Sequence, residues 1–450
     1  MNLRIDNKIQ VQNIEQKSNS KVVDNFFDKN VNPIKDNDSI LINKKEKVAF
    51  QSINENFNDK EQLMLKEVDS IKELPDFSKT PLRIGIVVSQ KQANFTIPNG
   101  NVYIETKEGR KEIGSFDSQK TLTVKNENNH LIISDEKGKN LGIFEEGKIK
   151  VEGNISPVAI NGKKYRGDLE IFINPADKSN FHIVNDVMVE DYLKGVVPSE
   201  SSASWPIESL KAQTIAARTY ALSNWNRRES LGFDLMATTS DQVYNGMAVE
   251  HPATNQAISE TSGEVALYNG KPINALFFSC SGGYTDSAKE VWQTDLPYIQ
   301  PAKDFDQKAP KYKWVQTFNN NDIQTGLKKL GVDAGTIQNI TIKEKTEHGR
   351  ATKLTIKGSK GEFDVDGNKF RLAVGLNSTR FTVEPSLSAT KKLLSSKSPS
   401  GFVFNGGGWG HGLGMSQYGA RQMAEDGKSY DEIIKHYYAG VVIGKLDKAQ

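Results

Sequence analysis

The run from Gly195 to Ala217 places a carboxylate directly before a long helix, and it constrains the fold more than any other segment. It reads GVVPSESSASWPIESLKAQTIAA. Pro198 favours an extended approach, Ser204 is a good helix N-cap, and Pro206 suits a first helical turn. One face of the helix is then occupied by Ile207, Leu210, Thr214, Ala217 and Ala221. Glu200 is therefore expected in a turn held by a rigid helix, where a carboxyl group can act as an acid or base.

This run and three later segments resemble a known family. Continued through Arg218-Thr219-Tyr220-Ala221, the run is similar to the core of the stage II sporulation protein D (SpoIID/LytB) family of cell-wall enzymes, roughly GVVPxEM and WPxEALKAQAVAARTYA. Similar segments follow in the family's order: 238–246, 278–283 (FSCSGG) and 406–420 (GGGWGHGLGMSQYGA). The resemblance runs from near Pro81 to the Tyr437-Tyr438 pair, with a divergent stretch between Pro301 and Ser400. Ser201 stands where the family usually has methionine.

The resemblance implies a peptidoglycan lytic transglycosylase with Glu200 as its general acid and base. Such an enzyme cuts the β-1,4 bond between N-acetylmuramic acid and N-acetylglucosamine in peptide-free glycan strands and leaves 1,6-anhydro ends. Part of the family is named for enhancing an amidase, so a non-catalytic glycan-binding enhancer of a cell-wall amidase stays open. The implied partners are glycan strands and, in the second case, an amidase. Either activity implies an extracytoplasmic, wall-associated or membrane-associated protein.

The family also suggests which residues bind the substrate. Lys211 and Arg218 lie seven residues apart on one helix face, where they either orient Glu200, contact sugar hydroxyls or are solvated surface charges. Trp205 is positioned either to stack on a sugar ring or to pack beside the helix start. The other expected substrate-binding residues are Gln242, Tyr244, Ser279, Ser281, Gly282, Gly283, Trp409, His411 and Gln417.

A glycoside hydrolase and a cysteine peptidase are the alternatives to a transglycosylase. A glycoside hydrolase normally needs a second carboxylate, at about 5 to 5.5 Å for retention or about 6.5 to 9.5 Å for inversion. Asp191, Asp241 and Asp286 are the candidates for that role. A cysteine peptidase would use Cys280 with His411 as its base, although lone buried cysteines are usually inert.

No cofactor or metal is expected. Some members of the family carry Cys and His around the Thr238-Thr239 segment in a zinc-binding pattern, but here Met236, Ser240 and Asp241 occupy those positions. The glycines from Gly406 to Gly414 match neither phosphate-loop pattern. They are expected to let the backbone pass close to another element.

Composition argues against a nucleic-acid partner, and taken at face value the sequence is not expected to contain an export segment. The 450 residues carry 58 basic and 56 acidic side chains, a net charge of +2, without a basic stripe, so no nucleic-acid partner is expected. Cys280 is the only cysteine, which excludes an intrachain disulfide. There is no 18-residue apolar run and the first residues lack the apolar centre of a signal peptide. This conflicts with the extracytoplasmic site of action that the family implies.

The pattern along the chain predicts an α+β fold with segregated strands and helices. Between residues 81 and 181, short apolar runs alternate with Asn-Gly, Glu-Gly and Lys-Gly turns, which is typical of β-hairpins. We expect helices at 189–194, ended by Gly195, and at 205–227, 319–330, 416–426 and 430–438. The expected parts are a linker-like tether (1–79), a β-rich module (80–180), a catalytic core beside the long helix (181–300), a β-rich insert (301–400), and a glycine-rich loop with helices that completes the catalytic domain (401–450).

Overall fold

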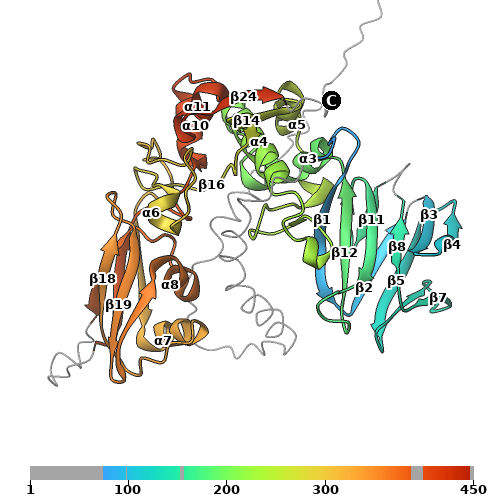
Figure 1. Cartoon of the computed structure of the whole chain (residues 1–450), viewed down its shortest axis with the longest axis horizontal. Helices are drawn as coiled ribbons and strands as arrows, with labels where there is room; N and C mark the ends of the chain where they lie inside the picture. The colour runs from blue at the N-terminus through green and yellow to red at the C-terminus, as the bar shows by residue number, and fades with distance from the viewer. Residues whose placement is uncertain (1–73, 98, 153–156, 387–398, 446–450) are drawn as a thin grey trace, which may run out of the picture.

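The computed structural model describes residues 74–97, 99–152, 157–386 and 399–445, and it has the expected α+β fold. Strand-rich parts lie at the two ends of the molecule, with most helices between them (Figure 1). The expected tether lies largely outside the described residues. Its last residues are packed, however, because Phe77 is buried with its ring 6.1 Å from that of Trp225.

Two sheets form the first strand-rich part. One has seven strands in the order β13-β1-β12-β11-β8-β3-β4 and the other has six in the order β10-β9-β2-β5-β6-β7. The strand bounds are β1 Leu82–Gln90, β2 Gln92–Ile97, β3 Gly100–Thr106, β4 Gly109–Phe116, β5 Lys120–Glu127, β6 His130–Ser134, β7 Asn140–Phe144, β8 Lys148–Val151, β9 Val158–Ile160, β10 Lys163–Tyr165, β11 Asp168–Ile173, β12 Phe181–Val187 and β13 Leu235–Met236. The expected boundary at 180/181 falls between β11 and β12, which pair along their length. The sheet therefore continues into the part expected to be the catalytic core.

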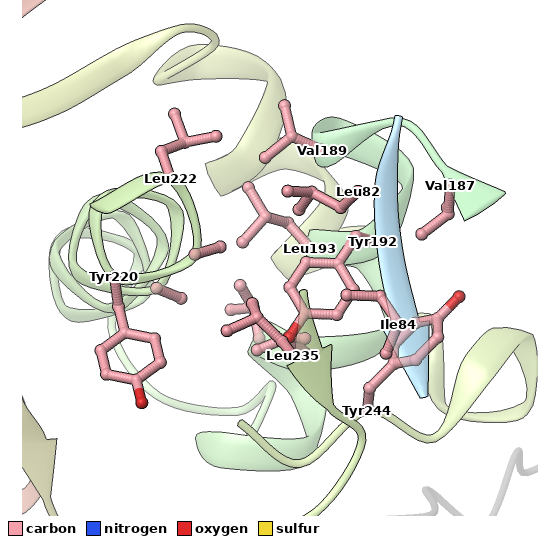
Figure 2. Packing of buried hydrophobic residues seen from close by; sticks show 14 of the residues in the cluster. Leu82, Ile84, Val187, Val189, Tyr192, Leu193, Tyr220, Leu222, Leu235 and Tyr244 are labelled. Atoms are coloured by element: carbon pink, nitrogen blue, oxygen red, sulfur yellow. The ribbon is translucent and has the colours of Figure 1, made fainter. Parts of the chain in front are cut away.

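A central helix organises the middle of the molecule. α4 (Ile207–Ser223) packs against α3 (Val189–Glu200), α5 (Pro252–Glu260), α10 (Gln417–Glu425), α11 (Tyr430–Tyr437) and the sheet β15-β14-β24. Its alanines, among them Ala212, Ala216 and Ala217, are fully buried and allow this close packing on several sides. Leu222 of α4 joins Leu193 of α3 in the same apolar cluster as residues from β1 (Figure 2). The sheet strands are β14 Glu264–Tyr268, β15 Lys271–Pro272 and β24 Val442–Lys445.

The predicted start of α3 at Val189 is confirmed, but its predicted end and both predicted ends of α4 are wrong. α3 does not end at Gly195 but continues through Pro198 to Glu200. Gly195 is needed for packing rather than for a helix end, because a Cβ there would lie 2.5 Å from the ring of Tyr244. α4 begins at Ile207 without a side-chain cap, and Ser204 bonds to Ser202 instead. α4 ends at Ser223 rather than at residue 227.

A second hydrophobic core lies between residues 314 and 404. Two three-stranded sheets and two helices surround Phe370, Phe402 and Phe404, which are fully buried. The elements are β17 Trp314–Asn319, α7 Asn320–Lys329, β18 Ile337–Lys345, β19 Ala351–Gly358, β20 Gly361–Asp366, α8 Gly367–Val374, β21 Phe381–Ser386 and β22 Gly401–Gly406. Because β22 pairs with both β17 and β21, this core extends past residue 400, where the insert was expected to end.

Short elements join the two cores. β16 (Phe277–Phe278) runs parallel to β23 (Met415–Ser416), and α6 (Ala288–Trp292) follows β16. The 3₁₀ turns η1 (Glu229–Leu231) and η2 (Gly246–Val249) lie between α4 and α5. In the part of the chain that the structure describes, no helix is both long and apolar enough to cross a membrane.

Candidate functional site

Glu200 is the last residue of α3. The chain leaves the helix at Ser201, which is extended with φ −136° and ψ 143°. The carboxyl group therefore lies at the negative end of the helix dipole, which disfavours a carboxylate. The simplest alternative role for this residue, a glutamate that stabilises the start of the next helix, does not fit this position.

The Glu200 carboxyl group has one close backbone donor. The Val243 N–H donates to Oε1 at 2.8 Å. No ion pair of the described residues involves Glu200, although the residue keeps partial exposure to solvent. Burial of the carboxyl raises its pKa from 4.5 to about 7, while the hydrogen bonds from Val243 and Gln417 act in the opposite direction. Near neutral pH both the protonated and the ionised forms are therefore populated.

Gln417 supports Glu200 through its backbone carbonyl. It is the first residue of α10, and its Nε2 donates to the Glu200 carbonyl at 3.0 Å and to Gln213 Oε1 at 3.4 Å. Ser201 Oγ also donates to Gln213 Oε1 at 3.4 Å. Sequence reasoning identified Gln417 but missed Gln213. The available signal was a polar amide on an otherwise alanine-rich, packed helix.

Trp205 and Ser279 both contact Tyr418, the residue after Gln417. The half-buried Trp205 ring meets that of Tyr418 edge-on, with centroids 5.1 Å apart, and Arg421 lies 5.5 Å from the Trp205 centroid. The Tyr418 N–H donates to the Ser279 carbonyl at 3.0 Å. The pairing of β16 with β23 sets this register, so residues more than 200 positions apart assemble around Glu200.

Gln242 and Tyr244 face the interior rather than solvent. Gln242 accepts a hydrogen bond from Tyr192 at 3.1 Å, and Tyr244 donates to Asn185 at 2.9 Å. Both are buried. The group that reaches Glu200 is the backbone of the residue between them, Val243, which sequence reasoning missed because a main-chain donor leaves no signature in residue type.

The two expected cations have other partners. Lys211 pairs with Glu208 and Glu260, each at 2.9 Å. Arg218 is 1 % exposed and donates to both carboxylate oxygens of Glu190, at 2.9 and 2.7 Å. It also donates to the Glu264 carbonyl, so it joins α4 to α3 and β14. The structure brings neither cation into hydrogen-bonding contact with Glu200.

The Ser281-Gly282-Gly283 segment forms a buried turn. Ser281 is fully buried and accepts from the Gly283 N–H at 3.0 Å, while the Gly282 N–H donates to Asp306 Oδ2 at 2.7 Å. The glycine-rich loop passes directly over this turn, because a Cβ on Gly408, at φ 83°, would lie 2.5 Å from the Ser281 carbonyl. The expectation that these glycines allow a close backbone approach is confirmed.

Trp409 and His411 flank the same turn. The backbones of Trp409 and Cys280 exchange two hydrogen bonds, and the Trp409 ring lies 5.9 Å from the Lys311 ammonium. His411 packs between Phe278 and Trp292, with Nδ1 accepting from the Leu413 N–H and Nε2 bonded to the Phe277 carbonyl.

This geometry argues against a cysteine nucleophile. Burial raises the pKa of the Cys280 thiol to about 12, so the reactive thiolate does not form near neutral pH. Burial also lowers the pKa of His411 to about 3, and both ring nitrogens are occupied by backbone groups. His411 therefore has no free nitrogen with which to activate a thiol.

The three candidate second carboxylates all have cation partners. Asp191 pairs with Lys194 at 2.7 Å. The Asp241 side chain is fully buried and pairs with Arg228 at 2.7 Å and Arg227 at 3.7 Å. Asp286 pairs with Arg350 at 2.6 Å, and both side chains are fully buried.

No group of three or more His, Cys, Asp or Glu residues within the described ranges is arranged to hold a metal ion. At the positions where some family members have a zinc-binding pattern, Asp241 instead receives hydrogen bonds from Arg228 and the Met236 N–H. The residues present at this location suit an ion pair rather than a metal.

Comparisons with known proteins identify two regions of similarity. Residues 177–268 match the SpoIID family model, described as stage II sporulation protein, and residues 286–414 match a domain of unknown function (DUF8618). Stage II sporulation protein D of Bacillus amyloliquefaciens is 35% identical over 292 residues, which cover 61% of this chain and 79% of that protein. An uncharacterized protein of Brachyspira hyodysenteriae is 35% identical over 67% of this chain and 78% of its own length. The amidase enhancer of Bacillus subtilis is 31% identical over 64% of this chain and 45% of the relative.

Proposed function

The chain belongs to the stage II sporulation protein D family, and from this premise we propose that it is a peptidoglycan lytic transglycosylase with Glu200 as its catalytic residue. Protonated Glu200 donates its proton to the glycosidic oxygen of the leaving N-acetylglucosamine. The resulting carboxylate takes the proton of the muramic acid C6 hydroxyl, whose oxygen attacks the anomeric carbon. The glycosidic bond breaks, a 1,6-anhydro ring forms, and Glu200 regains its proton.

The burial of the Glu200 carboxyl group, with the Val243 N–H as its close backbone donor at 2.8 Å, is the observation that carries this proposal. One group must act first as an acid and then as a base, so its pKa has to lie near the working pH. Burial raises the pKa in that direction, and among the described residues no cation pairs with the carboxyl to reverse the shift.

The state of the other carboxylates favours a transglycosylase over a hydrolase. A hydrolase needs a second carboxyl group that can attack or can activate water. The side chains of Asp241 and Asp286 are fully buried in arginine pairs, and Asp191 is paired with Lys194. The intramolecular C6 hydroxyl removes the need for that second group.

We assign Trp205 and Ser279 to the binding of sugars next to Glu200, with Gln417 holding the acid in place. The Trp205 ring is half-buried, and an aromatic ring with an open edge or face suits a pyranose. Arg218, Gln242 and Tyr244 support this site through the core contacts described above. The substrate places the enzyme's action outside the cytoplasmic membrane.

Mass spectrometry of purified, peptide-free glycan strands tests the proposal. Incubation with the protein should yield fragments with anhydro ends, and Glu200→Gln should yield none. Glu260→Gln is the matched control, because Glu260 is an exposed glutamate on α5. Fragments with reducing ends would indicate a hydrolase and would contradict the proposal.

The amidase enhancer of Bacillus subtilis supports a second candidate, a glycan-binding enhancer of a cell-wall amidase. The same variant separates the two functions, because Glu200→Gln abolishes cleavage but leaves an enhancer nearly unchanged. The measurement is the rate of amidase release of stem peptides with and without each form of the protein.

A further inference from the structure

Arg350 belongs to the part of the chain that forms the second core, but its buried side chain contacts Ser281 and Asp286 outside that core. It ends the turn between β18 and β19 and is fully buried. Its Nε donates to Asp286 Oδ2 at 2.6 Å and its Nη2 donates to the Ser281 carbonyl at 3.0 Å. One guanidinium therefore binds both ends of the segment 281–286.

The opposite segment is shaped around the same guanidinium. A Cβ on Gly412, where φ is 84°, would lie 2.0 Å from the Arg350 Cζ, so only a glycine leaves room for it. The Asp286 N–H donates to the Gly412 carbonyl at 2.9 Å, and Asp286 forms a parallel bridge with Leu413. Arg350 thus lies where the segments 281–286 and 409–414 meet.

The segments 281–286 and 409–414 are each close in sequence to a residue that contacts α10 or Glu200. Ser279, two residues before Ser281, accepts the Tyr418 N–H at 3.0 Å. Gly412 is followed by β23 and then by Gln417, which donates to the Glu200 carbonyl at 3.0 Å. A shift of either segment would therefore move the groups that support Glu200.

We propose that Arg350 is a positioning residue for Glu200: its guanidinium fixes the segments 279–286 and 409–417 in register and so holds Gln417 behind the acid. The inference rests on the proposed function and gives the second core a role in it. Lysine cannot replace Arg350, because a single ammonium cannot reproduce two directed N–H donors in a planar guanidinium. A misplacement of about 1 Å can cost roughly 100-fold in rate.

Hydrogen exchange of the full chain tests the register without needing activity. In Arg350→Lys, the amides of Asp286, Trp409 and Tyr418 should exchange faster, because their acceptors lie on the segments that Arg350 joins. Leu354→Ala is the matched control, since Leu354 is fully buried in the second core and has no part in these hydrogen bonds. Unchanged protection in Arg350→Lys, or equal loss in Leu354→Ala, would overturn the proposal.

Steady-state cleavage of glycan strands then separates positioning from stability. Arg350→Lys should lower kcat by about tenfold or more with KM nearly unchanged, while Leu354→Ala lowers Tm and keeps kcat. The double variant Arg350→Met with Asp286→Leu replaces a buried ion pair by apolar side chains, which often restores stability. Its Tm should recover relative to Arg350→Met while kcat stays low, because the bond to Ser281 is still missing.

The outcomes separate the two proposals. Recovery of kcat together with Tm in the double variant would show a purely structural role for Arg350. If the unmodified protein cleaves no glycan, the proposed function fails, and hydrogen exchange still decides whether Arg350 sets the register of the two segments.

Discussion

The carboxyl groups of Asp241 and Glu200 both lie beside the loop that contains Val243, but their hydrogen-bond and charge partners differ. The Asp241 side chain is fully buried, with two arginines, the Met236 N–H and the Tyr220 hydroxyl around its oxygens. Glu200 receives one backbone N–H, from Val243, and no cation of the described ranges pairs with it. Buried charge needs compensation. The compensated carboxylate anchors the loop, whereas the uncompensated one is suited to gain and lose a proton.

The largest effect is expected from Glu200→Gln. General acid-base catalysis contributes roughly 10²- to 10⁴-fold, and glutamine can neither donate nor accept the transferred proton, so cleavage should fall by at least that range. The measurement is the rate of anhydro-end formation, with circular dichroism to verify folding. Retained cleavage in a folded variant would remove Glu200 from the mechanism.

Asp241→Asn should show the opposite pattern, a loss of stability rather than of chemistry. Removing one partner of a buried ion pair costs about 3 to 5 kcal/mol because a charge stays buried and unpaired. Urea denaturation should show this decrease in the free energy of unfolding. If Asp241→Asn were as stable as the unmodified protein but inactive, Asp241 would be the missing second carboxylate.

The pH dependence should reveal the raised pKa of Glu200 in both activity and stability. The value of kcat/KM should fall as the pH rises past about 7, because the acid loses its proton. The folded state holds this proton more tightly than the unfolded chain, so Glu200 lowers stability as the pH rises from about 4.5 to about 7. Glu200→Gln lacks that change. Parallel stability curves of the two proteins over this interval would contradict the shift.

Cys280→Ala should have the smallest effect. The thiol is protonated and buried, so its removal should leave cleavage unchanged and lower Tm slightly through lost packing. The assay is the same glycan digestion with both proteins at equal concentration. Loss of activity in a folded Cys280→Ala would revive the thiol as a nucleophile.

Local sequence signals predicted the bounds of those helices that begin with a polar capping residue. α7, α10 and α11 begin and end within a residue of the predicted positions, and a polar side chain caps the start of each. α3 was predicted too short because glycine and proline usually end a helix. There Gly195 packs against Tyr244, 49 residues away, and local sequence signals cannot show such a contact.

The same limit applies to the candidate site. Glu200 and Gln417 belong to recognisable segments, and the structure places them in contact. Helical spacing could not show that Arg218 is buried, because its partner Glu190 lies on another helix. Arg350 lies in the stretch that diverges from the family pattern, and only the fold brings it to Ser281.

The bond between Gln417 and Glu200 joins residues 217 positions apart. Contacts this distant in sequence slow folding, because the entropy of closing the intervening chain is lost before the contact forms. The ribosome adds Glu200 before it adds α10, so a nascent or truncated chain contains Glu200 without Gln417 to support it.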